Sequence, residues 1–304
     1  MFKNNPFKDA ENYRAVVISE EEQQIRSFYK ELKDEVSKEV KRLDAKTDET
    51  DRIYLMRLNA ELSSRINQIG EQTKSVVSNG VVSITERVLH NNRVFLNNMG
   101  FADYRSNPQL VTTMADFVIS GRLYGNKWSL SSSIWGSSLK TQQDVNKIIS
   151  RGIIEGKSTY DIAKQLEKYV NPDVVHPVMN GVNGEVDYNA QRLARTMTQH
   201  AYQEAFVELT KDNPFIEAYQ WITSGMSNVC ALCIEREEAD DYGLGPGIYP
   251  KDALPLDHPN GNCTFDIVTD WDEDSARQAV MEWNFGELDD EELAEALDEF
   301  ADTF

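Results

Sequence analysis

A long helical spacing of apolar residues, from Ser19 to about residue 100, is the feature that most constrains the fold of this chain. These residues recur in steps of three and four, which places their side chains on one stripe of an α-helix. A polar break separates two runs: Ile25, Phe28, Leu32, Val36, Val40 and Leu43, then Leu55, Leu58, Leu62, Ile66, Ile69, Val76, Ile84 and Val88. We therefore predict a hairpin of two long antiparallel helices over residues 19–100. An intermolecular coiled coil is the alternative, although the stripe departs from strict heptads.

The segments before and after this stretch differ in composition. Residues 1–18 show no clear periodicity and are predicted to form an N-terminal arm. Residues 101–185 are predicted to form a helical middle region, in which Gly156 suits a helix end and Ser158 suits a helix N-cap. A loop rich in proline and glycine near residues 171–186 is the expected boundary with a smaller C-terminal unit.

Residues 186–271 combine helix and strand patterns and are predicted to form a small α+β module. A helix is expected from residue 188 to about residue 211. Its inner stripe is predicted to be Leu193, Met197, Ala201 and Ala205. Residues 215–224 and 264–271 alternate in hydrophobicity, which is typical of strands. Residues 272–304 are predicted to form an acidic C-terminal tail.

All three cysteines lie within 34 residues, between the two predicted strands: Cys230, Cys233 and Cys263. The odd number and the close clustering argue against a disulfide framework. The N-terminal sequence MFKNNPFKDAENY also lacks the pattern of a secretory signal. We therefore expect reduced thiols that share one role.

The spacing of these cysteines, together with His258, predicts a metal site. Two residues separate Cys230 from Cys233, so one tight turn can direct both thiolates to one point. After 24 more residues come His258 and then Cys263, separated by four residues. The four side chains would form a closed Cys3His site for structural Zn²⁺, because four protein ligands leave no open coordination position. The alternatives are thiols without metal beside a loop histidine, or a Cys-x-x-Cys redox pair.

These patterns together predict the fold class. The chain is expected to be mainly α, with a long helical N-terminal region followed by a small α+β module that carries a zinc-clip-like Cys/His site. The longest apolar runs are only a few residues, so no membrane span is predicted.

The charge is strongly uneven along the sequence. The chain has 31 Lys and Arg against 51 Asp and Glu, for a net charge of −20. Residues 270–304 alone contain 14 acidic residues and one basic residue. This balance argues against a general nucleic-acid-binding protein, although it leaves room for a local basic face. The acidic stretch could equally be a docking helix for a basic partner or a solvated tail.

The patterns that would indicate catalysis are incomplete. The sequence has no His-Glu-x-x-His and no His-x-Glu of the kind found in zinc deaminases, and His90, His176 and His200 each stand alone. The alternative function is a metal-dependent nuclease or toxin-like effector enzyme. Its carboxylates would be Asp240, Asp241, Asp252 and Asp257. A nucleic-acid-binding module would instead use Lys140, Lys147, Arg151, Lys157, Lys164 and Lys168.

Several motifs appear in a recognisable order between about residues 128 and 271. They are IISRGIIEGKSTYDIAKQL, LARTMTQHAYQEA, AYQWITS, CALC and LPLDHPNGNCTF. In this order the sequence resembles the phage Mu F-like minor head proteins, also called head morphogenesis proteins, of tailed bacteriophages. The family typically has an Ala-Arg-Thr-Glu helix and a closing His-Pro-Asn-Cys-Arg-Cys. Here Met197 replaces the Glu, and Gly261 and Asn262 replace the first Cys and the Arg, so Cys263 alone remains of the closing pair.

The resemblance implies a structural virion component without catalysis. Such a protein would be made in the host cytoplasm and lie inside the capsid, bound near the portal in the procapsid. There it would assist head assembly and DNA packaging or ejection. The implied partners are the phage portal protein and a scaffold or major capsid protein, with a weak DNA contact and no membrane contact.

Overall fold

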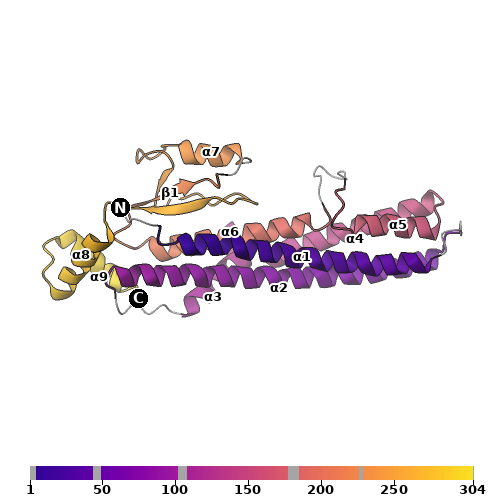
Figure 1. The fold of residues 1–304 in the computed structure, drawn as a ribbon, viewed down its shortest axis with the longest axis horizontal. Helices are drawn as coiled ribbons and strands as arrows, with labels where there is room; N and C mark the ends of the chain where they lie inside the picture. The colour runs from indigo at the N-terminus through magenta and orange to yellow at the C-terminus, as the bar shows by residue number, and fades with distance from the viewer. Residues whose placement is uncertain (1–4, 44–48, 102–107, 177–184, 226–228, 304) are drawn as a thin grey trace. The chain divides into compact units, whose positions relative to one another are not determined.

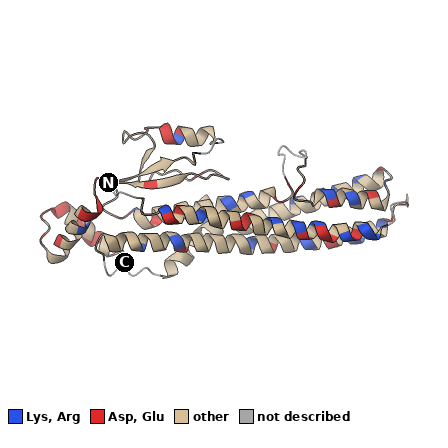
Figure 2. Cartoon of the chain, in the orientation of Figure 1, with Lys and Arg blue, Asp and Glu red and all other residues tan. Residues whose placement is uncertain are grey.

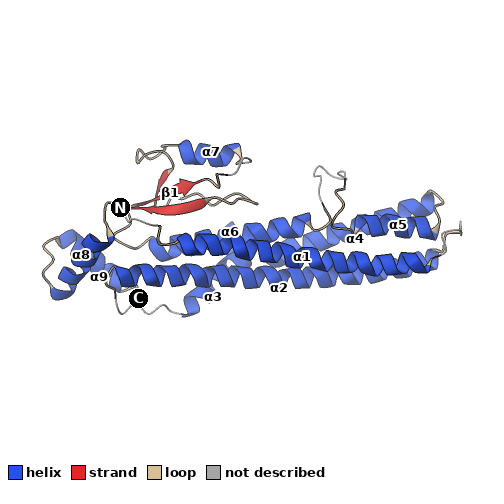
Figure 3. Cartoon of the chain, in the orientation of Figure 1, coloured by secondary structure: helices blue, strands red, loops and turns tan. Residues whose placement is uncertain are grey.

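The computed structural model describes residues 5–43, 49–101, 108–176, 185–225 and 229–303. Helices dominate these residues, and the strands form one small sheet (Figure 3). The mainly α fold with a small α+β part, which the sequence predicts, is therefore confirmed.

The two long apolar runs lie on helices α1 (Lys8–Arg42) and α2 (Arg52–Asn98) (Figure 1). The side chains of Tyr13 and Ser83 are hydrogen-bonded at 2.7 Å, and Arg65 Nε donates to Glu35 at 2.8 Å. Residue numbers thus rise along α1 as they fall along α2, so the two helices are antiparallel. Most of the predicted stripe is buried, which explains the spacing of its residues.

Helix α1 begins within the segment that we predicted to be an arm. Phe7, just before its first residue, is fully buried, and its ring packs edge-on against Phe95 and Phe206. Ala10 and Arg14 continue this buried face. The helical period was missed because one of its core positions is an arginine.

The described chain divides into two compact units, each built from separated stretches of sequence. Unit 1 comprises residues 1–17, 80–118 and 196–304, and unit 2 comprises residues 18–79 and 119–195. Helices α1, α2 and α6 (Tyr188–Thr210) each contribute to both units. The division falls within α6, after Arg195, and not in the loop that we predicted near residues 171–186; residues 177–184 of that loop lie outside the described residues.

Unit 2 contains the last part of α1, the first part of α2, and the helices α4 (Leu130–Ile154) and α5 (Thr159–Tyr169). A short 3-10 helix, η1 (Arg122–Tyr124), precedes α4. As predicted, Ser158 caps α5, because its side chain accepts a hydrogen bond from the N–H of Asp161 at 3.1 Å. Thr50 Oγ1 donates to the carbonyl of Lys157 at 2.7 Å and ties the start of α2 to this cap.

Unit 1 contains α3 (Pro108–Ile119), which ends at the unit boundary, and a three-stranded sheet. The strands are β1 (Ala218–Ile222), β2 (Ile248–Pro250) and β3 (Thr264–Val268), in the order β2-β1-β3 with antiparallel neighbours. β1 and β3 lie within the two predicted strands. β2 and helix α7 (Ala231–Glu238) were not predicted, because both are short. Trp221, Phe265 and Phe206 form an aromatic core between the sheet and α6.

The predicted acidic tail is folded. It forms α8 (Glu273–Phe285) and α9 (Glu291–Ala301), and Asp272 caps α8 by accepting from the N–H of Ser275. Leu297 and Phe300 of α9 are buried, and the Phe300 ring packs edge-on against Phe101. These two apolar side chains therefore belong to the core of unit 1.

Candidate metal centre

Two connections of the sheet in unit 1 supply the predicted metal ligands. Cys230 is the N-cap of α7, which follows β1, and Cys233 lies in the first turn of that helix. His258 and Cys263 lie on the connection from β2 to β3, and Cys263 directly precedes β3. The last residue of β1 pairs with the first residue of β3, so both ligand segments start from neighbouring points of the sheet. The tight turn that we predicted for the first pair is the N-terminal turn of a helix.

The structure brings the four side chains together in two overlapping groups. Cys230 Sγ lies 3.1 Å from His258 Nε2, and Cys263 Sγ lies 3.3 Å from Cys233 Sγ. Cys230, Cys233 and His258 form one group, and Cys233, Cys263 and Asp257 form the other; within each group all ligand atoms are within 4.8 Å of one another. Each group could hold a metal ion, and Cys233 belongs to both.

The three thiols have different environments. Cys233 and Cys263 are each only 3% exposed, whereas Cys230 is exposed. Burial raises the pKa of the Cys233 and Cys263 thiols, and neighbouring Asp257 adds to the increase at Cys263. The backbone N–H of Cys233 is the main cause of the lowered pKa of the Cys230 thiol. A bound cation would be needed to favour the thiolate form at the two buried positions.

The hydrogen bond at Nδ1 of His258 leaves Nε2 as the ring nitrogen that can bind a metal. Its Nδ1 lies 3.0 Å from the carbonyl oxygen of Pro259, which can only accept, so Nδ1 carries the proton. The lone pair of Nε2 then points toward Cys230 Sγ, which lies 3.1 Å away. A backbone carbonyl that fixes the tautomer in this way is a common feature of zinc-binding histidines.

We call residues 255–263 the closing loop. Asp257 holds the two proposed ligands of this loop, His258 and Cys263, in place. Its Oδ1 accepts from the N–H of His258 at 2.8 Å, and its Oδ2 accepts from the N–H of Cys263 at 3.2 Å and from Gln199 Nε2 at 3.0 Å. The residue is 3% exposed. Because its oxygens already accept three hydrogen bonds, the geometry favours a positioning role over metal ligation.

Gly261 is required by this arrangement. A Cβ atom at this position would lie 2.2 Å from both carboxylate oxygens of Asp257, closer than any non-bonded contact allows. The cysteine that the resembling family carries at this point of the closing motif would not fit this loop conformation. The cysteine present in the closing motif, Cys263, reaches the cluster, with its Sγ 3.3 Å from Cys233 Sγ.

One polar face of α6 binds the closing loop through several hydrogen bonds. Gln203 donates to the carbonyl of Pro255 at 2.7 Å and accepts from the N–H of Asp257 at 2.9 Å. His200 Nε2 lies 2.9 Å from the carbonyl of Asp257, and Thr196 Oγ1 accepts from the N–H of Asn260 at 2.9 Å. Our sequence analysis treated His200 as isolated. The spacing of Thr196, Gln199, His200 and Gln203, at positions i, i+3, i+4 and i+7, was the signal that could have revealed this face.

Arg14 completes the site from the start of the chain. Its Nη1 donates to the carbonyl of Cys263 at 2.9 Å, and its Nη2 donates to Asn262 Oδ1 at 3.2 Å. Its guanidinium also lies 4.9 Å from the ring centroid of Tyr202. The side chain is 3% exposed, and this burial lowers the pKa of the guanidinium. Sequence reasoning missed Arg14 because its partners lie near the other end of the chain.

The carboxylates of the alternative enzyme do not form one site in the described chain. Among Asp240, Asp241, Asp252 and Asp257, only Asp257 belongs to a cluster that could hold a metal ion. Asp240 accepts from the N–H of Gly245 at 2.9 Å and so stabilises a turn.

Ion pairs engage several of the basic residues proposed for a nucleic-acid contact. Lys147 pairs with Asp144, Arg151 and Lys157 both pair with Glu155, and Lys164 pairs with Glu167. Their charges are therefore partly balanced within unit 2, which weakens the local basic face.

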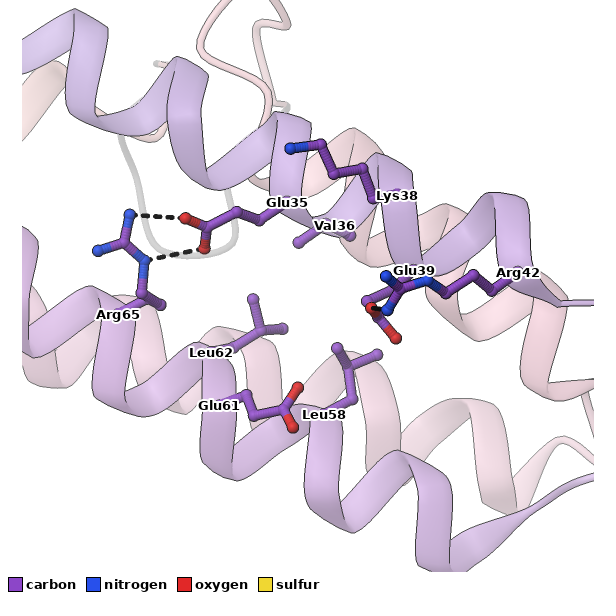
Figure 4. Close-up of a pocket in the computed structure, with 9 residues that line it drawn as sticks. All are labelled: Glu35, Val36, Lys38, Glu39, Arg42, Leu58, Glu61, Leu62 and Arg65. Atoms are coloured by element: carbon purple, nitrogen blue, oxygen red, sulfur yellow. Dashed lines mark hydrogen bonds and ion pairs between the residues drawn. The ribbon is translucent and has the colours of Figure 1, made fainter.

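Unit 2 also contains a groove of about 240 Å³ between α1 and α2 (Figure 4). Its apolar residues are Val36, Leu58 and Leu62. Its three acidic side chains are each paired with an arginine: Glu35 with Arg65, Glu39 with Arg42 and Glu61 with Arg57. With these carboxylates paired, the groove offers a mixed-charge surface.

Comparisons of the chain with models of protein families, with curated proteins and with solved structures give no match. Among the described residues, no helix combines the length and apolar character needed to cross a bilayer.

Proposed function

We propose that Cys230, Cys233, His258 and Cys263 bind one structural Zn²⁺. Three thiols and one imidazole are a donor set that zinc prefers, and four protein ligands would close its coordination shell. The observation that carries this proposal is the pairing of both ligand segments around Cys233, with the Cys233 and Cys263 sulfurs 3.3 Å apart. When bound, the ion would supply a crosslink between the start of α7 and the loop before β3.

Metal analysis of protein purified without chelator tests the zinc site. We expect about one zinc per chain in the wild type, and loss of zinc in Cys233→Ser and in His258→Gln. The matched control is His90→Gln, because His90 is exposed on α2 and lies outside the cluster, so its zinc content should be unchanged. Folded wild-type protein without metal would contradict the proposal. If that protein also contained a disulfide between cysteines of the cluster, the redox interpretation would replace it.

For the whole protein, we propose a minor head protein of a tailed bacteriophage. It would bind near the portal inside the procapsid and assist head assembly and DNA packaging or ejection. Its contacts would be with the portal protein and with scaffold or major capsid protein, with a weak DNA contact and no catalytic step. The resemblance of the motif order is the basis of this proposal. In the structure two of those motifs contact each other, since the α6 motif binds the closing motif through Thr196, Gln199 and Gln203.

Quantitative mass spectrometry of procapsids and mature particles of the source phage tests this function. We expect a few copies per particle, and loss of the protein from procapsids that lack the portal. A chain absent from both kinds of particle and abundant in the soluble lysate would overturn the proposal. The same samples show the fate of the protein, because its loss from particles after ejection would indicate that it leaves with the DNA.

A further inference from the structure

Helices α8 and α9 pack together in unit 1, and we call this pair of helices the platform. The Trp283 ring packs near Phe101, and Trp283 Nε1 donates to Asp298 Oδ1 at 3.0 Å, which links α8 to α9. Arg277 Nε donates to the carbonyl of Asn98 at 2.7 Å and fixes α8 to the end of α2. These contacts set the direction in which each face of α8 points.

Two large apolar side chains of this platform face outward. Met281 is 52% exposed and Phe285 is 73% exposed. They are four residues apart on α8 and therefore lie side by side on one helical face. The opposite face of α8, with Ala276, Ala279 and Val280, is buried, so the exposed pair is not needed for the core. Gly286 ends the helix directly after Phe285 with a left-handed conformation, φ 68°.

Acidic residues are frequent on α8, which carries this apolar pair, and on α9. Figure 2 shows Asp and Glu gathered on α8 and α9. By sequence, unit 1 contains 31 Asp and Glu against 10 Lys and Arg, whereas unit 2 contains 20 against 21. The negative charge of the chain is thus concentrated in the unit that carries the exposed pair. A surface of this kind attracts positively charged partners and repels negatively charged ones.

We propose that the Met281–Phe285 face of α8 docks a basic amphipathic helix of a partner protein. Large apolar residues at positions i and i+4 are the anchors with which one helix packs against the apolar stripe of another. The unbranched, flexible Met side chain adapts to such a surface, and Phe supplies a large contact area. Lys and Arg beside the partner's apolar stripe would meet the acidic residues of α8 and α9. This proposal does not depend on the phage function.

Fluorescence anisotropy with a labelled synthetic helix tests the proposal. The probe is an 18-residue peptide with Leu on one face and Lys elsewhere. We expect the full-length protein to bind it, and Met281→Ser combined with Phe285→Ser to weaken binding about tenfold or more. The matched control is Ile53→Ser combined with Met56→Ser. These residues are 83% and 71% exposed on α2 in unit 2 and should not affect binding.

Two further peptides separate the apolar and electrostatic contributions. A peptide with Glu in place of Lys, and one with Ser in place of Leu, should each bind at least about tenfold more weakly than the Leu/Lys peptide. Increasing salt should also weaken binding of the Leu/Lys peptide. Equal binding of that peptide to wild type and to the Met281/Phe285 variant would overturn the proposal, as would no binding to wild type. Sedimentation of the protein alone tests whether a second copy of the chain occupies the Met281–Phe285 face. Self-association that the double variant abolishes would assign the face to a second copy of the chain and overturn a basic partner.

Discussion

The carboxylate of Asp257 lies directly against Gly261 in the closing loop. The carboxylate of Asp257 fills the space that a side chain at position 261 would need, and it uses this position to bind the N–H groups of both loop ligands. The geometry of the proposed metal site therefore depends on Gly261, which leaves room for the Asp257 carboxylate. It also depends on Asp257, which positions the loop without being a ligand.

Replacing Gly261 with Ala should weaken metal binding. The added Cβ would displace the Asp257 carboxylate and break its hydrogen bonds, with an expected loss of about 1–3 kcal/mol in the free energy of unfolding. Zinc affinity, measured by competition with a chromogenic chelator, should fall about 10–100-fold. Gly136→Ala is the control, because a Cβ there meets nothing within 4 Å and Gly136 lies within α4. Equal zinc affinity in Gly261→Ala and wild type would contradict this account.

Asp257→Asn distinguishes a positioning residue from a metal ligand. Cobalt in place of zinc reports the ligand set through its visible and near-ultraviolet absorption. If Asp257 only positions the loop, the variant should keep the tetrahedral thiolate spectrum of the wild type while its cobalt affinity falls about 10–100-fold. A changed spectrum at saturating cobalt would instead assign Asp257 to the coordination shell.

The polar face of α6 is the element on which the closing loop is built. Four residues of this face bind backbone or side-chain groups of residues 255–263, and they lie at positions i, i+3, i+4 and i+7 of the helix. A face of this composition resembles a solvent-exposed one in sequence. It is buried because the loop covers it and forms hydrogen bonds with each of the four residues.

Gln203→Met should destabilise unit 1. The substitution preserves the approximate size of the side chain but leaves the N–H of Asp257 and the carbonyl of Pro255 without their partner, at a cost of about 1–3 kcal/mol each. Urea denaturation followed by circular dichroism measures this loss. Glu208→Gln on the same helix should change stability by less than about 1 kcal/mol, because its ion pair with Lys211 is exposed. A similar effect of both substitutions would argue against the role of the polar face.

The long helices could be predicted from the sequence because their signal is local. Leu55, Leu58 and Leu62 repeat at helical spacing and are all buried. The short elements β2 and α7 carry too few residues for a period to be visible. The four proposed ligands were found by their spacing, whereas Arg14 and Gln203 act on residues far away in sequence. Only the folded chain places those partners together.

The two units differ in how much they should depend on the metal. The cluster and its supporting residues all belong to unit 1, whereas α4 and α5 belong to unit 2. Hydrogen exchange with and without a strong chelator tests this difference. Chelation should speed amide exchange in residues 229–268 and leave α4 and α5 largely unchanged. Equal acceleration in α5 and in residues 229–268 would contradict this expectation and show that the units unfold together.

The hydrogen bond from Arg14 to Cys263 joins residues that are 249 positions apart. At about 5–20 residues per second, a ribosome would make Arg14 roughly 12–50 s before Cys263. Every residue of unit 2 has been synthesised once Arg195 is in place, while unit 1 still lacks its last long segment. On the nascent chain, unit 2 is therefore the first that can fold. Until Cys263 has been synthesised, Arg14 lacks this hydrogen-bond partner, and its guanidinium would remain hydrated.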